Sequence, residues 1–334
     1  MSRDASILSL LEVGIAVAIA LLAFPAHAGD AAGASPLPPD LPPSATRHTV
    51  VLAGHAAGRQ ATWKGSDGSV NVFFQYDDRG RGPRTTTSVA LDAAGRPTAL
   101  QIEGVSYLKE NFAERFLTDG ANAIWTNRGE RGRRKLDGPA FYTCMDGPPE
   151  ETAMLARALL AAGGVLPLLP DGEARLERVR ERELSIGGAR ERVTLYAIAG
   201  LSFSPVHVWL DARGTLFATG DDWLMVVREG WESVVPRLVR WQEEAASART
   251  AALAKRLVRR PSRRVLFYGA DLFDAETATV RKGVTVVVAG NRIESVAPAA
   301  PGDRERRDAE VVDATGRTLL PGLWDMHVHV TPDD

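Results

Sequence analysis

Short β-prone segments separated by turn residues run from about His48 to Leu136, and this pattern limits the fold more than any other feature. β-Branched and aromatic residues alternate or cluster between Gly, Asp and Asn in RQATWKG, SVNVFFQYDD, TTTSVALDAAG, PTALQIEG and NAIWTNRG. Similar segments follow in ERVTLYAIAG, PVHVWLD and GTLFATG, and an Asp-Ala-Arg-Gly turn joins the last two. The pattern predicts an antiparallel, β-rich domain over residues 47–221.

Two stretches have helical periodicity. The segment GPPEETAMLARALLAAGG predicts one helix inside the β-rich domain, with Pro149 in its first turn and Gly163 at its end. A longer stretch over about 222–258 repeats apolar residues at three and four positions, and Pro236 inside it predicts a kink or two abutting helices. We expect its aromatic stripe to pack against the first domain, and residues 222–260 to form a helical extension and linker.

Charge gives no reason to expect a polyanionic partner. The net charge of the 334 residues is −2 and the sequence pI is about 6.3, so we predict no nucleic-acid binding. One basic cluster, KRLVRRPSRR at 255–264, departs from this balance. No aromatic residues interleave with its charges, so we interpret it as a solvated helix end that runs into a linker.

The N-terminal residues resemble an export signal. An apolar run from Val13 to Phe24 precedes the small-residue pattern Ala26-His27-Ala28, and twelve apolar residues are too short for a permanent membrane anchor. We predict a signal peptide at 1–28, a disordered Pro/Gly/Ala-rich tail at 29–46, and a mature protein without a stable membrane anchor. The predicted location is the periplasm or the outside of the cell.

Few residues suit nucleophilic catalysis. Cys144 is the single cysteine, so no intramolecular disulfide can form, and no histidine neighbours it in sequence. We interpret it as a buried structural thiol rather than a nucleophile. The sequence also lacks a Gly-x-Ser-x-Gly elbow, a phosphate-binding loop and a Cys-x-x-Cys pair.

The C-terminal segment PGLWDMHVH carries the most suggestive chemistry. Residues two apart on a strand share a face, so Asp325, His327 and His329 would point the same way. The two histidines would lie about 6.5 to 7 Å apart along the backbone, close enough to bind one ion. Upstream, strands are expected from Arg264 onward, with a hairpin turn at Ala289–Arg292.

The run VVDATGRTLLPGLWDMHVH resembles the start of the barrel in the amidohydrolase superfamily. The preceding GADLFDAETATVRKGVTVVVAGNRIESVAP is similar to the small β-sandwich of its imidazolonepropionase-like and dipeptidase-like branch. The resemblance implies an α+β chain. Its N-terminal antiparallel β-rich domain with helices would be followed by part of a β-sandwich at 264–320 and, at 321–334, the first strand of a truncated (β/α)₈ barrel.

The same resemblance implies a metal-dependent hydrolase that acts on amide or other non-peptide C–N bonds of a small amide or cyclic amide. His327 and His329 would bind one of one or two divalent ions, usually zinc, and Asp325 would support them. A metal held by neutral imidazoles lowers the pKa of bound water to about 7. The general base is expected beyond residue 334, so we expect this chain to be an inactive N-terminal fragment.

A second hypothesis is a non-catalytic β-domain that binds an apolar ligand or an envelope protein. A sizeable apolar cavity inside residues 48–220 would favour it, whereas a filled core would count against it.

Overall fold

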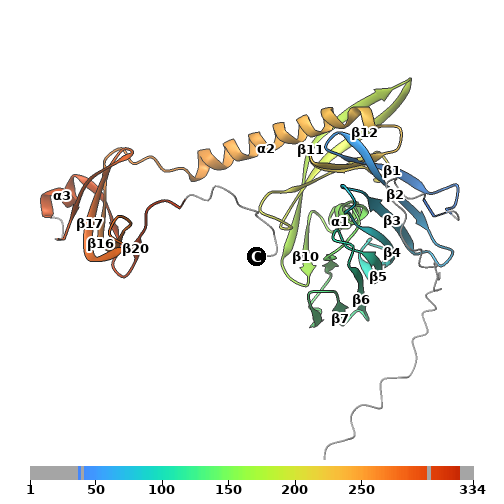
Figure 1. Cartoon of the computed structure of the whole chain (residues 1–334), viewed down its shortest axis with the longest axis horizontal. Coiled ribbons are helices and arrows are strands. Elements are labelled where there is room, and N and C mark those ends of the chain that lie inside the picture. The colour runs from blue at the N-terminus through green and yellow to red at the C-terminus, as the bar shows by residue number, and fades with distance from the viewer. Residues whose placement is uncertain (1–36, 39–40, 299–301, 324–334) are drawn as a thin grey trace, which may run out of the picture.

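A computed structural model describes residues 37–38, 41–298 and 302–323 of the chain, and its strands form two sheets (Figure 1). The signal peptide predicted at 1–28 lies outside these residues. The larger sheet contains β1 (Thr46–Leu52), β2 (His55–Lys64), β3 (Val70–Tyr76), β4 (Arg84–Leu91), β5 (Pro97–Val105), β6 (Asn111–Thr118), β7 (Asn122–Thr126), β8 (Arg131–Lys135), β9 (Phe141–Tyr142), β10 (Val165–Leu169), β11 (Glu173–Ile186), β12 (Ala189–Ala199), β13 (Val206–Asp211), β14 (Leu216–Gly220) and β15 (Leu224–Arg228). The smaller sheet contains β16 (Arg264–Asp274), β17 (Thr279–Ala289), β18 (Arg292–Ala297), β19 (Ala309–Asp313) and β20 (Thr318–Leu319). The helical elements are α1 (Glu150–Ala161), the short 3₁₀ turn Glu232–Val234, α2 (Val235–Leu257) and α3 (Asp303–Arg307).

The fifteen-stranded sheet consists of two runs of neighbouring hairpins. Strands β8 to β1 lie in one run and β15 to β9 in the other, and the runs join where β1 pairs with β15 antiparallel. Every pairing in this sheet is antiparallel except the short parallel pair β9–β10. Each strand predicted between His48 and Leu136 is confirmed, because closely spaced turns leave room only for antiparallel neighbours.

Helix α1 lies against the concave face of this sheet (Figure 1). Pro149 precedes its first residue and Gly163 follows its end with φ +77°, as predicted. Met154, Leu155 and Leu159 are almost fully buried and join a core that draws on both runs of strands. That core contains Val72, Val89, Leu100, Ile102, Phe116, Trp125, Phe141, Tyr142, Leu166, Leu168, Ile198, Val208, Leu210 and Leu216.

Helix α2 covers the opposite face. In β13, Val208 and Leu210 belong to the α1 core, whereas Trp209 packs in a second core under the first turns of α2. The Trp209 indole N–H also donates a 3.1 Å hydrogen bond to Oε1 of Gln242 on α2. The predicted packing of the aromatic stripe is confirmed by Trp231 and Trp241, which lie against this second core.

The start of α2 differs from the prediction. Residues 224–228 form strand β15, and the helix begins at Val235 and continues to Leu257. Pro236 lies in the first turn, where no backbone N–H is needed for a helical hydrogen bond, so it causes no kink. The apolar run before it pairs with β1 and β14 instead of extending the helix.

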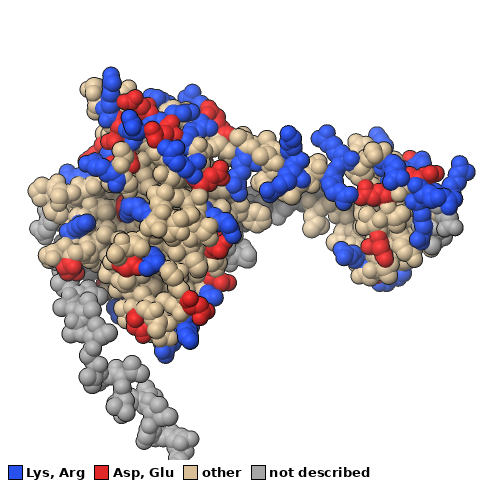
Figure 2. Space-filling model, turned by 180° about the vertical axis from the view of Figure 1, so that it is seen from behind, with Lys and Arg blue, Asp and Glu red and all other residues tan. Residues whose placement is uncertain are grey.

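The outer half of α2 leads to the five-stranded sheet (Figure 1). The hairpin turn predicted at Ala289–Arg292 is confirmed, with Gly290 at φ +58°. Lys and Arg side chains are prominent along this end of α2 and over the smaller sheet (Figure 2). Residues 255–260 of the basic cluster are exposed at the end of the helix, as expected for a solvated helix end.

The predicted α+β fold with a (β/α)₈ barrel is wrong. The protein is predominantly β, and no barrel of this type occurs in the described residues. Strand β11 was not predicted, for a separate reason. Its sequence EARLERVRERELSI is charged and mostly exposed, so it lacks the alternation that identifies a half-buried strand.

Truncating Leu155 to Ala should lower the free energy of unfolding by about 2–5 kcal/mol, because Leu155 is 1% exposed and its loss leaves a cavity inside the curved sheet. Leu160→Ala on the same helix is the matched control, since Leu160 is 48% exposed and should cost less than about 1 kcal/mol. Urea unfolding followed by circular dichroism measures both. Equal losses would show that α1 does not fill the core.

Candidate functional site

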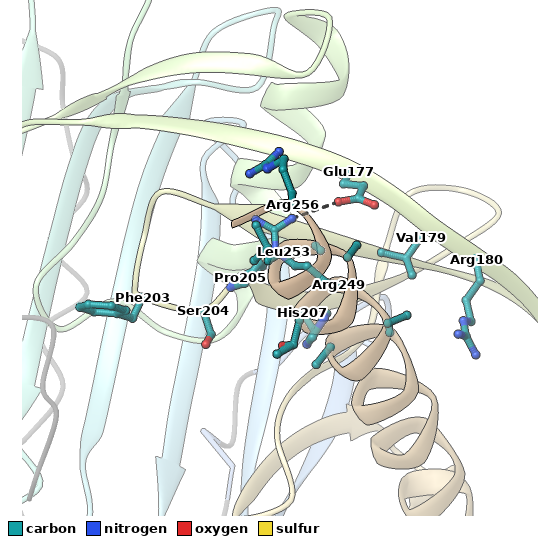
Figure 3. Close-up of a pocket in the computed structure, with 16 residues that line it drawn as sticks. Glu177, Val179, Arg180, Phe203, Ser204, Pro205, His207, Arg249, Leu253 and Arg256 are labelled. Atoms are coloured by element: carbon teal, nitrogen blue, oxygen red, sulfur yellow. Dashed lines mark hydrogen bonds and ion pairs between the residues drawn. The ribbon is translucent and has the colours of Figure 1, made fainter. Parts of the chain in front are cut away.

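A groove of about 800 Å³ lies between the outer half of α2 and the sheet (Figure 3). We call it the α2 groove. Strands β11, β12 and β13 and the loop before β13 provide one wall, and α2 provides the other. The residues that line it are Glu177, Val179, Arg180, Ala197, Phe203, Ser204, Pro205, His207, Ala245, Ala246, Ala248, Arg249, Thr250, Ala252, Leu253 and Arg256.

The α2 groove has a mixed lining, and its apolar part comes largely from alanines and Leu253 of α2. Small side chains on this part of the helix leave space instead of filling it, whereas bulky Trp241, nearer its start, packs against the second core. The pairing of β11 with β12 shifts register between Arg178 and Arg180, and such an irregularity bends a strand. Phe203 is 98% exposed on the loop at the groove's edge, so its ring is available for contact with a ligand.

Arginines give the α2 groove a basic character. Arg249 forms an ion pair with Glu177 at 3.5 Å, and Arg180 pairs with Glu244 at 2.7 Å. Arg256 has no hydrogen bond or ion pair within the part of the chain that the structure describes. Burial lowers the pKa of His207, so its ring is neutral at neutral pH and offers one donor and one acceptor. The groove is therefore suited to an apolar molecule that carries a negative charge.

The interior of the curved sheet leaves almost no room for a ligand. The cavity there, beside Cys144 and Glu151, has a volume of about 10 Å³. Such a space holds at most about one water molecule. The filled core counts against an apolar ligand inside residues 48–220 and directs attention to the outer surface.

A polar cluster beside this cavity has a structural role. Glu114 accepts hydrogen bonds from the Tyr142 hydroxyl at 2.7 Å and from the backbone N–H groups of Met145 and Asp146. Burial, with the nearby carboxyl groups of Glu151 and Glu114, raises the pKa of the Cys144 thiol. A protonated thiol is a poor nucleophile, which agrees with the structural role predicted for Cys144, although its side chain is half-buried rather than fully buried.

The predicted metal ligands cannot be placed. His327 and His329, with Asp325 beside them, lie outside the described residues, so the divalent metal stays a prediction. Within the described ranges, no group of three or more His, Cys, Asp and Glu side chains could hold a metal ion. The same ranges contain no helix that is long and apolar enough to span a bilayer.

Sequence reasoning missed the α2 groove. Its residues come from segments up to about eighty positions apart, and each residue type is ordinary for its own element. The one local signal is the change along α2 from Trp241 to alanines, which marks where close packing against the sheet ends.

Neither a family model nor a curated protein matches this sequence. Among solved structures, the chain is similar to a β-barrel-like protein of the domain of unknown function DUF1849 from Brucella abortus, with 11% sequence identity and a TM-score of 0.34. The match covers 55% of this chain and 94% of that chain.

The resemblance to the amidohydrolase superfamily is therefore corrected. No family model supports it, and the part of the motif that the structure describes, up to Leu323, contains β19 and β20, which pair with β16 in the small sheet. The expected hydrolysis of a small amide was inferred from that resemblance and loses its basis with it.

His48 is a buried histidine whose role is structural. Its Nε2 lies 3.0 Å from the backbone oxygen of Leu216, so this nitrogen donates and Nδ1 is unprotonated. Burial, reinforced by nearby Arg228, lowers the pKa of His48 to about 4. Between pH 6.5 and 4 the unfolded chain therefore binds a proton that the folded chain does not, and stability falls as the pH drops through this window.

Replacing His48 with Gln should make stability less sensitive to acid. The free energy of unfolding of the wild type minus that of His48→Gln should fall by up to about 3 kcal/mol between pH 6.5 and 4. The reason is that His48 must stay neutral in the fold, whereas Gln does not titrate. Urea unfolding at several pH values measures this difference. Contributions from the other titrating groups are the same in both proteins and drop out of it. Exposed His55→Gln is the control and should keep a constant difference. A constant difference for His48→Gln as well would contradict the argument.

Proposed function

We propose that residues 46–257 form a non-catalytic binding module whose α2 groove takes an amphiphile with an apolar tail and an anionic head. The observation that carries the proposal is the combination, in one groove, of apolar walls and the unpartnered Arg256. The N-terminal signal-peptide pattern leads us to propose further that the module acts in the periplasm or outside the cell.

The groove's size supports this class of ligand. Its volume of about 800 Å³ lies within the range of about 300–1,000 Å³ that small-molecule sites occupy. A flexible alkyl chain suits a groove between a helix and a sheet, because the walls need shape complementarity but few hydrogen bonds. Each buried CH₂ group contributes about 0.8 kcal/mol, so the tail would provide most of the affinity.

Charge supports an anionic head. Glu177 and Glu244 already neutralise Arg249 and Arg180, which leaves Arg256 as the cation available to a ligand. A carboxylate beside Arg256 would form charge-assisted hydrogen bonds, whereas an ammonium group would be repelled. Arg256 follows Leu253 by three residues, so head and tail contacts come from adjacent turns of one helix face.

Palmitate and hexadecylamine provide probes of equal chain length and opposite charge. Isothermal titration calorimetry of the full chain, below the critical micelle concentration, should show palmitate binding more tightly than hexadecylamine. Ala248→Trp should abolish palmitate binding, because the indole would occupy the groove. Ala251→Trp is the matched control, since Ala251 is exposed on α2 and does not line the groove. Equal effects of the two substitutions would reject this site.

The charge contact has its own test. Arg256→Gln should weaken palmitate binding by about threefold to tenfold, which is the range for one lost charge-assisted contact at a solvent-accessible site. Binding of hexadecylamine should not weaken. Arg260→Gln, four residues further on and outside the groove, should leave both unchanged. A similar loss of palmitate affinity in both variants would indicate general attraction to the basic cluster.

A further inference from the structure

The two ends of the fifteen-stranded sheet come together without pairing as strands. Strand β8 is the last strand at one end and β9 the last at the other, beyond β10. The Arg134 guanidinium of β8 reaches across, donates a 2.8 Å hydrogen bond to the backbone oxygen of Pro170 and pairs with Asp171 at 3.5 Å. A second groove, of about 600 Å³, lies between these ends, and we call it the seam.

Both strands that border the seam have unused backbone groups. The Leu136 N–H donates to Ala121 and the Asn127 N–H to Glu130, so even-numbered residues of β8 point their backbone groups toward β7. The backbone groups of Arg131, Arg133 and Lys135 consequently point away from β7.

The facing strand has a free side too. Strand β10 pairs with β11 through residues 165–167 and with β9 only at Leu168 and Leu169. Its remaining edge contains Pro167, which lacks an N–H and is tolerated at the border of a sheet.

The seam combines an apolar floor with a strongly basic border. Leu136, Val165, Leu166 and Leu168 line the floor. The five residues of β8 read RGRRK, and four of them are cationic. The side chains of Arg131, Arg133 and Lys135 are exposed and form no hydrogen bond or ion pair in the described part of the chain.

Negative groups nearby do not cancel this charge. Asp171 pairs with Arg134, Asp92 pairs with Arg96, and Asp137 lies on the exposed loop after β8.

We propose that the seam binds an extended acidic segment of a partner protein, which adds to β8 as a further strand. Its backbone would complete the unused hydrogen bonds, which is how strand addition gains affinity. Alternate side chains of an added strand face opposite sides, so acidic residues would lie opposite Arg131, Arg133 and Lys135 while apolar residues turn toward the floor.

The charge of β8 excludes its pairing with another copy of itself. Two antiparallel β8 strands would place cations opposite cations, which destabilises a pair, and cationic borders of this kind prevent sheets from aggregating. The same charge attracts an acidic segment. The positive charge of β8 thus selects a segment of negative charge. The five residues of β8 limit how many residues of that segment can pair with it.

Three capped peptides test the proposal on the full chain. Glu-Val-Glu-Val-Glu-Val-Glu should bind, with an affinity that falls as salt is raised. Its basic counterpart, with Lys in place of Glu, should not bind. An acidic peptide N-methylated at its two inner Glu residues keeps the charge but lacks the two N–H groups that would face β8 in antiparallel pairing, and should bind at least tenfold more weakly. Fluorescence anisotropy of labelled peptides measures all three, and equal binding of the N-methylated peptide would overturn strand addition.

Variants of the protein locate the site. Arg133→Gln should weaken binding of the acidic peptide at least threefold. Arg190 is an exposed arginine at the far end of the β11–β12 hairpin, and Arg190→Gln should leave binding unchanged. Hydrogen exchange should show new protection of the Arg131, Arg133 and Lys135 amides when the peptide is bound. Unchanged protection, or equal effects of the two substitutions, would reject the seam. Ala248→Trp should leave peptide binding intact, which separates this result from that of the α2 groove.

Discussion

The packing of α1 against the concave face of the large sheet is the interaction on which the rest of the structure depends. A twisted sheet of fifteen strands, nearly all antiparallel, tends to curl, and its inner face then needs apolar material to exclude water. Helix α1 provides that material from the middle of the chain. Its start is fixed by the Glu150 N–H, which donates to Gln60 on β2, while Arg157 donates to Gly214 beyond β13. The helix thereby connects the two runs of strands.

Filling the inner face has a consequence for function. A curled sheet with an empty interior can hold a ligand within it, but here Tyr142, Leu155 and their neighbours occupy that space. Binding surfaces are left to the outer face and to the ends of the sheet. The α2 groove lies on the outer face, where the alanines of the helix leave the space toward β11 unfilled. The seam uses the ends, where β8 and β10 approach but form no ladder.

Local sequence patterns were sufficient for much of the fold and for little of the site. The strands with alternating apolar residues and helix α1, with Pro149 before it and Gly163 after it, follow from near neighbours alone. Strand β11 does not, because its charged residues are stabilised by pairing with β12 and not by burial. Strand β15 was mistaken for helix because its apolar residues fit both periods, and contacts with β1 decide the outcome. The C-terminal motif misled because a short run can fit a familiar pattern by itself, without the rest of the fold that the pattern implies; the strands in its described part, β19 and β20, belong to the small sheet.

Helix α2 is supported differently along its length. Its first turns are held by Trp209 and Gln242, whereas the stretch after Ala245 is largely exposed to solvent. Alanine, leucine, lysine and arginine dominate that stretch, and these residues favour helix without help from tertiary contacts. Folding therefore places few demands on which side chains the exposed turns carry. This part of the molecule can accumulate substitutions, and so acquire new surface chemistry, while the sheet and its core stay as they are.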